Sequence, residues 1–116
     1  MKTERELLEA AAKAAGIKYD PDASKPHPKS GAFWGLWLTF DREPHEYDRR
    51  YWNPLTDDGD ALRLAVKLGL DLCVSPNYRL CAWNSVASDW VEEPPGNDPC
   101  AAMRLCIVRA AAAMAG

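Results

Sequence analysis

The sequence lacks an apolar run long enough to cross a membrane. Its most apolar segments, residues 61–74 and 99–115, are interrupted by charged side chains, whereas a membrane helix needs about 20 consecutive apolar residues. The first ten residues, MKTERELLEA, contain no apolar core of a secretory signal. We therefore expect a cytoplasmic protein with no membrane partner.

Catalytic motifs are also missing. The two histidines, His27 and His45, both fall in expected loops. No serine stands in a nucleophile-elbow motif, and no cysteine has an evident partner. A hydrolase built on the histidines is therefore unsupported. The sequence predicts a protein that is not an enzyme, with no catalytic residues and no cofactor.

Metal-binding patterns are absent as well. The four cysteines, at positions 73, 81, 100 and 106, form no CxxC pair, and no histidine is spaced to join them. Asp57, Asp58 and Asp60 do not fit the calcium loop, which needs oxygen ligands across about twelve residues and a final glutamate. They are better explained as helix caps, and as charges that suit the positive end of a helix dipole. We predict no metal site.

What the sequence does contain is an ordinary globular composition. The chain has 116 residues, of which 47% are hydrophobic and 27% charged, and its formal charge is -3. This length fits a single domain spanning residues 1–116. The negative charge argues against indiscriminate binding of nucleic acid.

Local patterns predict three helices. Each has an N-terminal cap and an amphipathic or alanine-rich body, and the first two end at a glycine. The second helix follows an Asn-Pro turn, which cannot itself be helical. The expected helices cover about residues 4–15, 57–68 and 98–114, and their caps are Thr3 with Glu6, Asp57 or Asp58, and Asp98 with Pro99.

Alternating patterns predict about four strands. Residues 32–40 form a dense apolar run that we expect to be buried on both faces, and residues 17–19 begin a short extended piece. Residues 70–74 and 78–83 alternate around a turn and predict a hairpin, to which residues 86–91 can add a third antiparallel strand. The predicted fold class is α+β, with an antiparallel or mixed sheet of about four strands sandwiched by about three helices.

Two cysteines lie in this hairpin. Cys73 and Cys81 are symmetric about Asn77, the centre of the expected turn, so their side chains fall close together on one face of the sheet. Two interpretations stay open: a disulfide, or small buried thiols in a reducing compartment.

Two stretches resemble a known group of proteins. WNPLTDDGDALRLAVKLGL at residues 52–70 and VEEPPGNDPCAAMRLCIVRAAAAM at residues 91–114 resemble small phage and prophage proteins of the phage ABA-sandwich type, to which the NinX-like proteins of lambdoid phages are also similar. In that group an Asn-Pro turn leads into the central helix, and a proline-marked start opens an alanine-rich final helix. The resemblance implies a helix-sheet-helix sandwich and a phage origin. It transfers no catalytic residues, and residues 17–50 match no pattern of the group.

The residues that favour a binding site lie in the middle of the chain, where aromatic side chains are interleaved with basic ones. This composition suits a nucleotide pocket, because aromatic faces stack on a base while arginines hold phosphate. In the alternative interpretation, the tryptophans belong to the core, the arginines cover its edge and neighbouring acids neutralise them. The predicted ligand-binding residues are Trp34, Trp37, Arg49, Arg50, Tyr51 and Trp52.

Two functions follow from this composition. The first is a phage-encoded, non-enzymatic binding protein that counters host defence by sequestering a nucleotide-derived immune signal in the cytoplasm of the infected bacterium. The second is an inhibitor or adaptor that binds a host protein, because aromatic residues and arginine are enriched at interface hot spots. A homo-oligomer would be a natural way to enclose a ligand in so small a fold.

Overall fold

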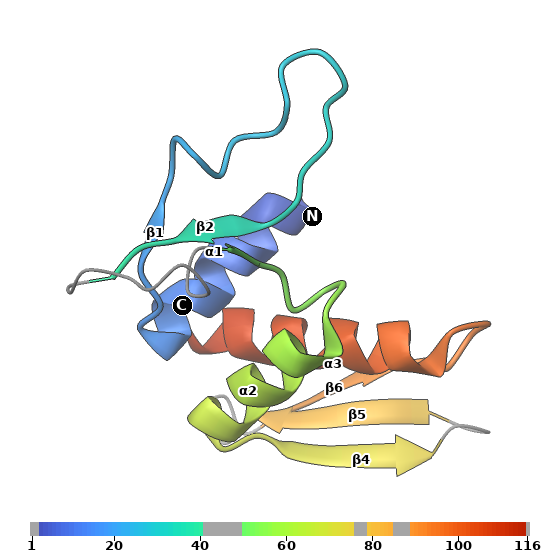
Figure 1. The fold of residues 1–116 in the computed structure, drawn as a ribbon. Helices are drawn as coiled ribbons and strands as arrows, with labels where there is room; N and C mark the ends of the chain where they lie inside the picture. The colour runs from blue at the N-terminus through green and yellow to red at the C-terminus, as the bar shows by residue number, and fades with distance from the viewer. Residues whose placement is uncertain (1–2, 41–49, 76–78, 85–88, 116) are drawn as a thin grey trace.

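The computed structural model describes residues 3–40, 50–75, 79–84 and 89–115, and within them the fold is α+β, as predicted (Figure 1). Three helices and six strands are found in this part of the chain. In chain order they are α1 (Glu4–Ala15), β1 (Tyr19–Asp20), β2 (Leu36–Leu38), β3 (Tyr51–Trp52), α2 (Asp58–Leu68), β4 (Asp71–Ser75), β5 (Arg79–Asn84), β6 (Asp89–Glu93) and α3 (Pro99–Met114).

The predicted helix boundaries are confirmed. The Thr3 hydroxyl accepts a hydrogen bond from the Glu6 amide, and the Glu6 side chain accepts one from the Thr3 amide, which completes the capping box of α1. Asp57 caps α2 and Asp98 caps α3, each through its side chain. These boundaries were predictable because capping depends on residues only a few positions apart.

The strands form two separate antiparallel sheets, of order β1-β2-β3 and β4-β5-β6. A single sheet of about four strands between helices is therefore not confirmed. The predicted strand at 32–40 is shorter than expected, and its partners are the two-residue strands β1 and β3. Strands of two residues carry no detectable alternation, so the sequence did not reveal that a second sheet would form around β2.

The expectation that residues 32–40 are buried on both faces is wrong. Leu36 is fully buried, but Trp34 is 54% exposed and Trp37 is only half-buried. An apolar run predicts burial on both faces only when something covers each face. In this sheet, one face packs on the core and the other is open.

The predicted hairpin is confirmed in its register. Cys73 lies opposite Cys81 in the pairing of β4 with β5, and β6 pairs with β5 on its other edge. The turn itself, at 76–78, and residues 86–88 of the predicted third strand lie outside the described residues. Cys73 is exposed and free, so the expectation of a buried thiol is wrong at this position.

Helix α3 runs through the middle of the molecule (Figure 1). On one side it contacts β5 and β6, and it also contacts α1 and α2. Its alanines permit this close packing: Ala110, Ala111 and Ala112 are all buried, together with Cys106, Ile107 and Val108. The helix is therefore buried on more than the single face that its sequence predicted.

The buried side chains form two clusters. The larger joins α1, α2, α3 and the first sheet around Leu8, Leu36, Leu64 and Val108. The smaller lies between α3 and the second sheet, and Leu70 and Met103 pack against both clusters.

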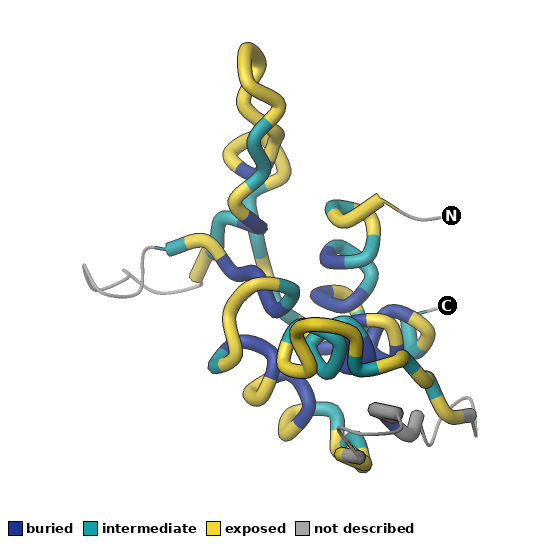
Figure 2. Tube along the Cα trace, turned by 90° about the vertical axis from the view of Figure 1, so that its right-hand side faces the viewer, coloured by how far each residue is buried: buried dark blue, intermediate teal, exposed yellow. Residues whose placement is uncertain are grey.

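The loop between β1 and β2 projects from this body and is mostly exposed (Figure 2). Ser24 is its buried anchor, with 1% of its surface exposed. The Ser24 hydroxyl donates to the Asp20 carbonyl at 2.6 Å and accepts from the Trp37 amide at 2.8 Å. These bonds fix the base of the loop against β2.

Candidate functional site

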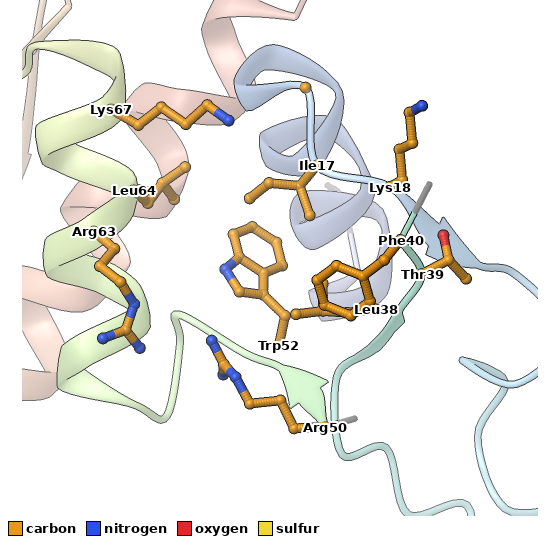
Figure 3. Close-up of a pocket in the computed structure, with 11 residues that line it drawn as sticks. Ile17, Lys18, Leu38, Thr39, Phe40, Arg50, Trp52, Arg63, Leu64 and Lys67 are labelled. Atoms are coloured by element: carbon orange, nitrogen blue, oxygen red, sulfur yellow. The ribbon is translucent and has the colours of Figure 1, made fainter. Parts of the chain in front are cut away.

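A cleft of about 410 Å³ lies between the end of α1, the strands β2 and β3, and α2 (Figure 3). This volume falls in the usual range of small-molecule sites. Four segments far apart in the sequence contribute to it, at residues 16–18, 38–40, 50–52 and 63–67.

The middle of the cleft is apolar. Trp52 and Leu64 form its floor and are almost completely buried, with 4% and 2% of their surfaces exposed. Ile17, Leu38 and Phe40 complete the apolar lining. Phe40 is 37% exposed, so it offers more surface to a ligand than Trp52 does.

Two arginines stand at one end of the cleft, and both are held by one buried carboxylate. The Oδ1 atom of Asp60 accepts from Arg50 Nη1 at 2.8 Å and from Arg63 Nη2 at 2.9 Å. Its Oδ2 atom accepts from the Asn53 amide at 3.0 Å. Asp60 is 1% exposed, so these bonds compensate for the loss of water around its charge.

The three acids at the start of α2 therefore have different roles. Asp57 accepts from the Asp60 amide at 2.8 Å and caps the helix, as predicted. Asp58 accepts from Arg104 of α3 at 2.6 Å, which ties the two helices together. Asp60 positions the arginines of the cleft, a role that sequence reasoning did not assign to it.

Two lysines stand toward the other end of the cleft, where Figure 3 shows Lys67 and Lys18 on the side away from Arg50 and Arg63. Lys67 follows Arg63 by four positions, so the two lie on the same face of α2. Among the described residues, Lys67 has no carboxylate within ion-pairing distance. Its charge is available to a ligand.

A glycine lets β2 lie directly against the end of β3. Gly35 has φ 124°, and a Cβ atom at this position would stand 2.5 Å from the Trp52 carbonyl oxygen and 2.9 Å from the Asn53 Cβ. Only glycine fits both the backbone angle and the space. Beside it, the Asn53 side chain accepts from the Leu55 amide at 3.0 Å and holds the turn that leads into α2.

The structure separates the predicted ligand-binding residues into two groups. Arg50 and Trp52 line the cleft. Trp37 and Tyr51 pair on the open face of the same sheet, because neighbouring residues of a strand point to opposite faces. Trp34 precedes β2 in the chain, and its exposed ring contacts the Tyr51 ring on that face. The remaining predicted residue, Arg49, lies outside the described residues.

The open face carries a continuous row of rings, which we name the aromatic patch: His27, Trp34, Trp37 and Tyr51. The ring centroids of His27 and Trp34 are 6.3 Å apart, those of Trp34 and Tyr51 are 6.0 Å apart, and those of Trp37 and Tyr51 are 5.0 Å apart. These are usual contact distances for aromatic rings. The patch is a second candidate surface, distinct from the cleft.

Sequence reasoning missed the contribution of α2 to the cleft. Arg63 and Lys67 are four positions apart and therefore share a helix face, but nothing in the sequence indicates that this face borders Trp52. Phe40 was also missed as a ligand contact, although it ends the apolar run at 32–40.

Neither a metal site nor a membrane span is found in the part of the chain that the structure describes. No three metal-ligating side chains gather there, and none of its helices has the length and apolar character needed to cross a bilayer. No family model matches the chain, and no curated protein or solved structure matches it either. The resemblance to the phage ABA-sandwich proteins stays a prediction.

Proposed function

We propose that the protein is a non-enzymatic binding protein that takes a small, nucleotide-like anion in the cleft. The observation that carries the proposal is the combination of an apolar middle, floored by Trp52 and edged by Phe40, with cationic side chains at both ends. Planar apolar groups bind on such a floor, and an anionic group of the same ligand binds to a cation at one end of it. Binding of a ligand in this way requires no catalytic residue.

The biological setting is part of the same proposal. Following the resemblance, the protein is phage-encoded and acts in the cytoplasm of the infected bacterium, where it sequesters a nucleotide-derived signal of host immunity. The helix-sheet-helix sandwich that the resemblance implies is part of this proposal too. A homo-oligomer would close the open side of the cleft over the ligand.

Calorimetry with a panel of cyclic and ADP-ribose-type nucleotides tests this function. We expect heat of binding for at least one of them. Phe40→Ala should weaken that binding, because Phe40 is partly exposed in the cleft, whereas Trp34→Ala on the open face should leave it unchanged. Absence of heat with every nucleotide of the panel would refute the nucleotide-binding function.

A second function, an inhibitor or adaptor that grips a host protein, is favoured by the aromatic patch. Trp34 is 54% and Tyr51 37% exposed, and exposed tryptophan and tyrosine in mutual contact are typical of interface hot spots. Affinity capture from host lysate separates the two functions. A stoichiometric protein that wild type and Phe40→Ala retain, and that Trp34→Ala loses, would favour the second function.

A further inference from the structure

We propose that Lys67 binds the anionic group of the ligand in the cleft, and that Arg50 and Arg63 bind an uncharged, planar part of the same molecule. This inference rests on the proposed ligand-binding function and narrows the ligand to a heteroaromatic compound with one anionic group. It assigns different roles to the two ends of the cleft, although both ends carry cations.

Within the part of the chain that the structure describes, the arginine end is close to electrically neutral. Arg50 and Arg63 both donate to Asp60, and Arg63 also lies 3.8 Å from Asp57 Oδ2. Two guanidinium charges thus face two carboxylate charges. A ligand anion placed here would gain from the arginines and lose to the aspartates at similar distances, so the end offers little net attraction to a phosphate.

The same arginines keep hydrogen-bonding capacity. A guanidinium has five N–H donors, and the shared bonds to Asp60 use one nitrogen of each side chain. Gly59 leaves room for the Arg63 group, since a Cβ there would lie 3.1 Å from both of its terminal nitrogens. Carbonyl oxygens and ring nitrogens are acceptors that such fixed donors bind without a charge on the ligand.

The lysine end has the opposite character. No carboxylate of the described chain pairs with Lys67, and Lys18 also lines the cleft at this end. Both lie across the apolar floor from the arginines (Figure 3). A ring resting on Phe40 and Trp52, with its acceptors toward Arg50, would therefore direct an attached phosphate toward Lys67.

Adenosine, AMP and ADP are suitable probes, because they share one ring system and differ in phosphate. We expect wild type to bind AMP about tenfold or more tighter than adenosine, and ADP no more than about twofold tighter than AMP. Lys67→Gln should bring the AMP-to-adenosine ratio close to one, and Lys67→Arg should restore it. Arg63→Gln should weaken the binding of AMP and of adenosine by similar factors, so the ratio of the two affinities should not change.

Lys13→Gln is the matched control, because Lys13 occupies the last turn of α1 as Lys67 occupies the last turn of α2, and it does not line the cleft. It should change neither affinity. Three results would overturn the inference and leave the binding function intact. In the first, Lys67→Gln still binds AMP more tightly than adenosine by the wild-type factor; in the second, Arg63→Gln loses this preference for AMP. In the third, wild type binds ADP far more tightly than AMP. Failure of adenosine, AMP, ADP and the wider nucleotide panel to bind refutes the proposed function itself.

Discussion

The two faces of the β1–β3 sheet show how one composition serves two purposes. Trp52 and Leu36 face the core and are 4% and 0% exposed, whereas Trp34, on the open face, is 54% exposed. Trp52 is joined to Tyr51 by a single peptide bond, yet the two belong to different surfaces. Whether a side chain of these strands is buried or exposed is decided by strand parity and by which face the core covers, and not by residue type.

The largest expected effect comes from truncating one tryptophan on each face. Trp52→Ala should lower the free energy of unfolding by about 3–5 kcal/mol, because it leaves a cavity in the main cluster. Trp34→Ala should cost less than about 1 kcal/mol, because the ring is mostly in water. Urea unfolding of both variants measures the difference, and equal losses would contradict the assignment of the two faces.

Gly35 allows the chain at the start of β2 to lie close against the end of β3. Gly35→Ala should destabilise the protein by about 3 kcal/mol, because it combines a strained φ with a clash against the Trp52 carbonyl. Gly31→Ala is the control: its φ is 72°, and no atom lies within 4 Å of the added Cβ, so only conformational strain of about 1–2 kcal/mol is expected. If both variants unfold at the same urea concentration, the close approach has no energetic role.

Asp60 is a buried charged residue beside the cleft. Asp60→Asn keeps the shape but turns one acceptor oxygen into a donor, which must then face either the Asn53 amide or the arginines. We expect a loss of about 1–3 kcal/mol in thermal or urea unfolding. Asp58→Asn, whose side chain is 74% exposed in its pair with Arg104, should cost less than about 1 kcal/mol. The reverse order would show that the Asp60 network is dispensable.

The smallest effect concerns pH and Tyr19, whose hydroxyl donates to Glu9 Oε2 of α1 at 2.8 Å. Burial, and then the hydrogen bond and the negative charge of Glu9, raise the pKa of Tyr19 above its ordinary value of 10.0. Folding therefore favours the protonated phenol. This contribution is complete below pH 10 and is lost as the pH rises through the raised pKa.

Tyr19→Phe checks this assignment. The free energy of unfolding, followed between pH 9 and about 11.5, should fall less steeply in the variant than in wild type, because the variant has no phenol to ionise. Identical slopes would mean that Tyr19 ionises equally in the folded and unfolded chains.

The sequence was informative where structure depends on near neighbours. The capping box at Thr3, the cap at Asp57 and the hairpin register that places Cys73 opposite Cys81 all follow from short stretches of sequence, and all are found. The cleft was only half predictable. Arg50 and Trp52 were chosen by composition, but their meeting with Lys67 depends on how α2 packs against β3, which is a property of the whole fold.

The division of Tyr51 from Trp52 could have been predicted once β3 was known, because alternation in a strand is strict. The strand itself was not recognised: two residues are too few to show a period, and the neighbouring segment from 41 to 51 is rich in charge. A composition-based site therefore merged two surfaces that the backbone keeps apart.

Because the walls of the cleft come from four separate segments, an occupant would act as a non-covalent cross-link between these segments. Thermodynamic linkage then couples occupancy to unfolding: a ligand present at 100 times its Kd adds about 2.7 kcal/mol to the free energy of unfolding. In a chain of this length such a gain raises the Tm by about 10 °C. A thermal-shift screen of metabolite libraries can therefore find the natural ligand without any assumption about its chemistry.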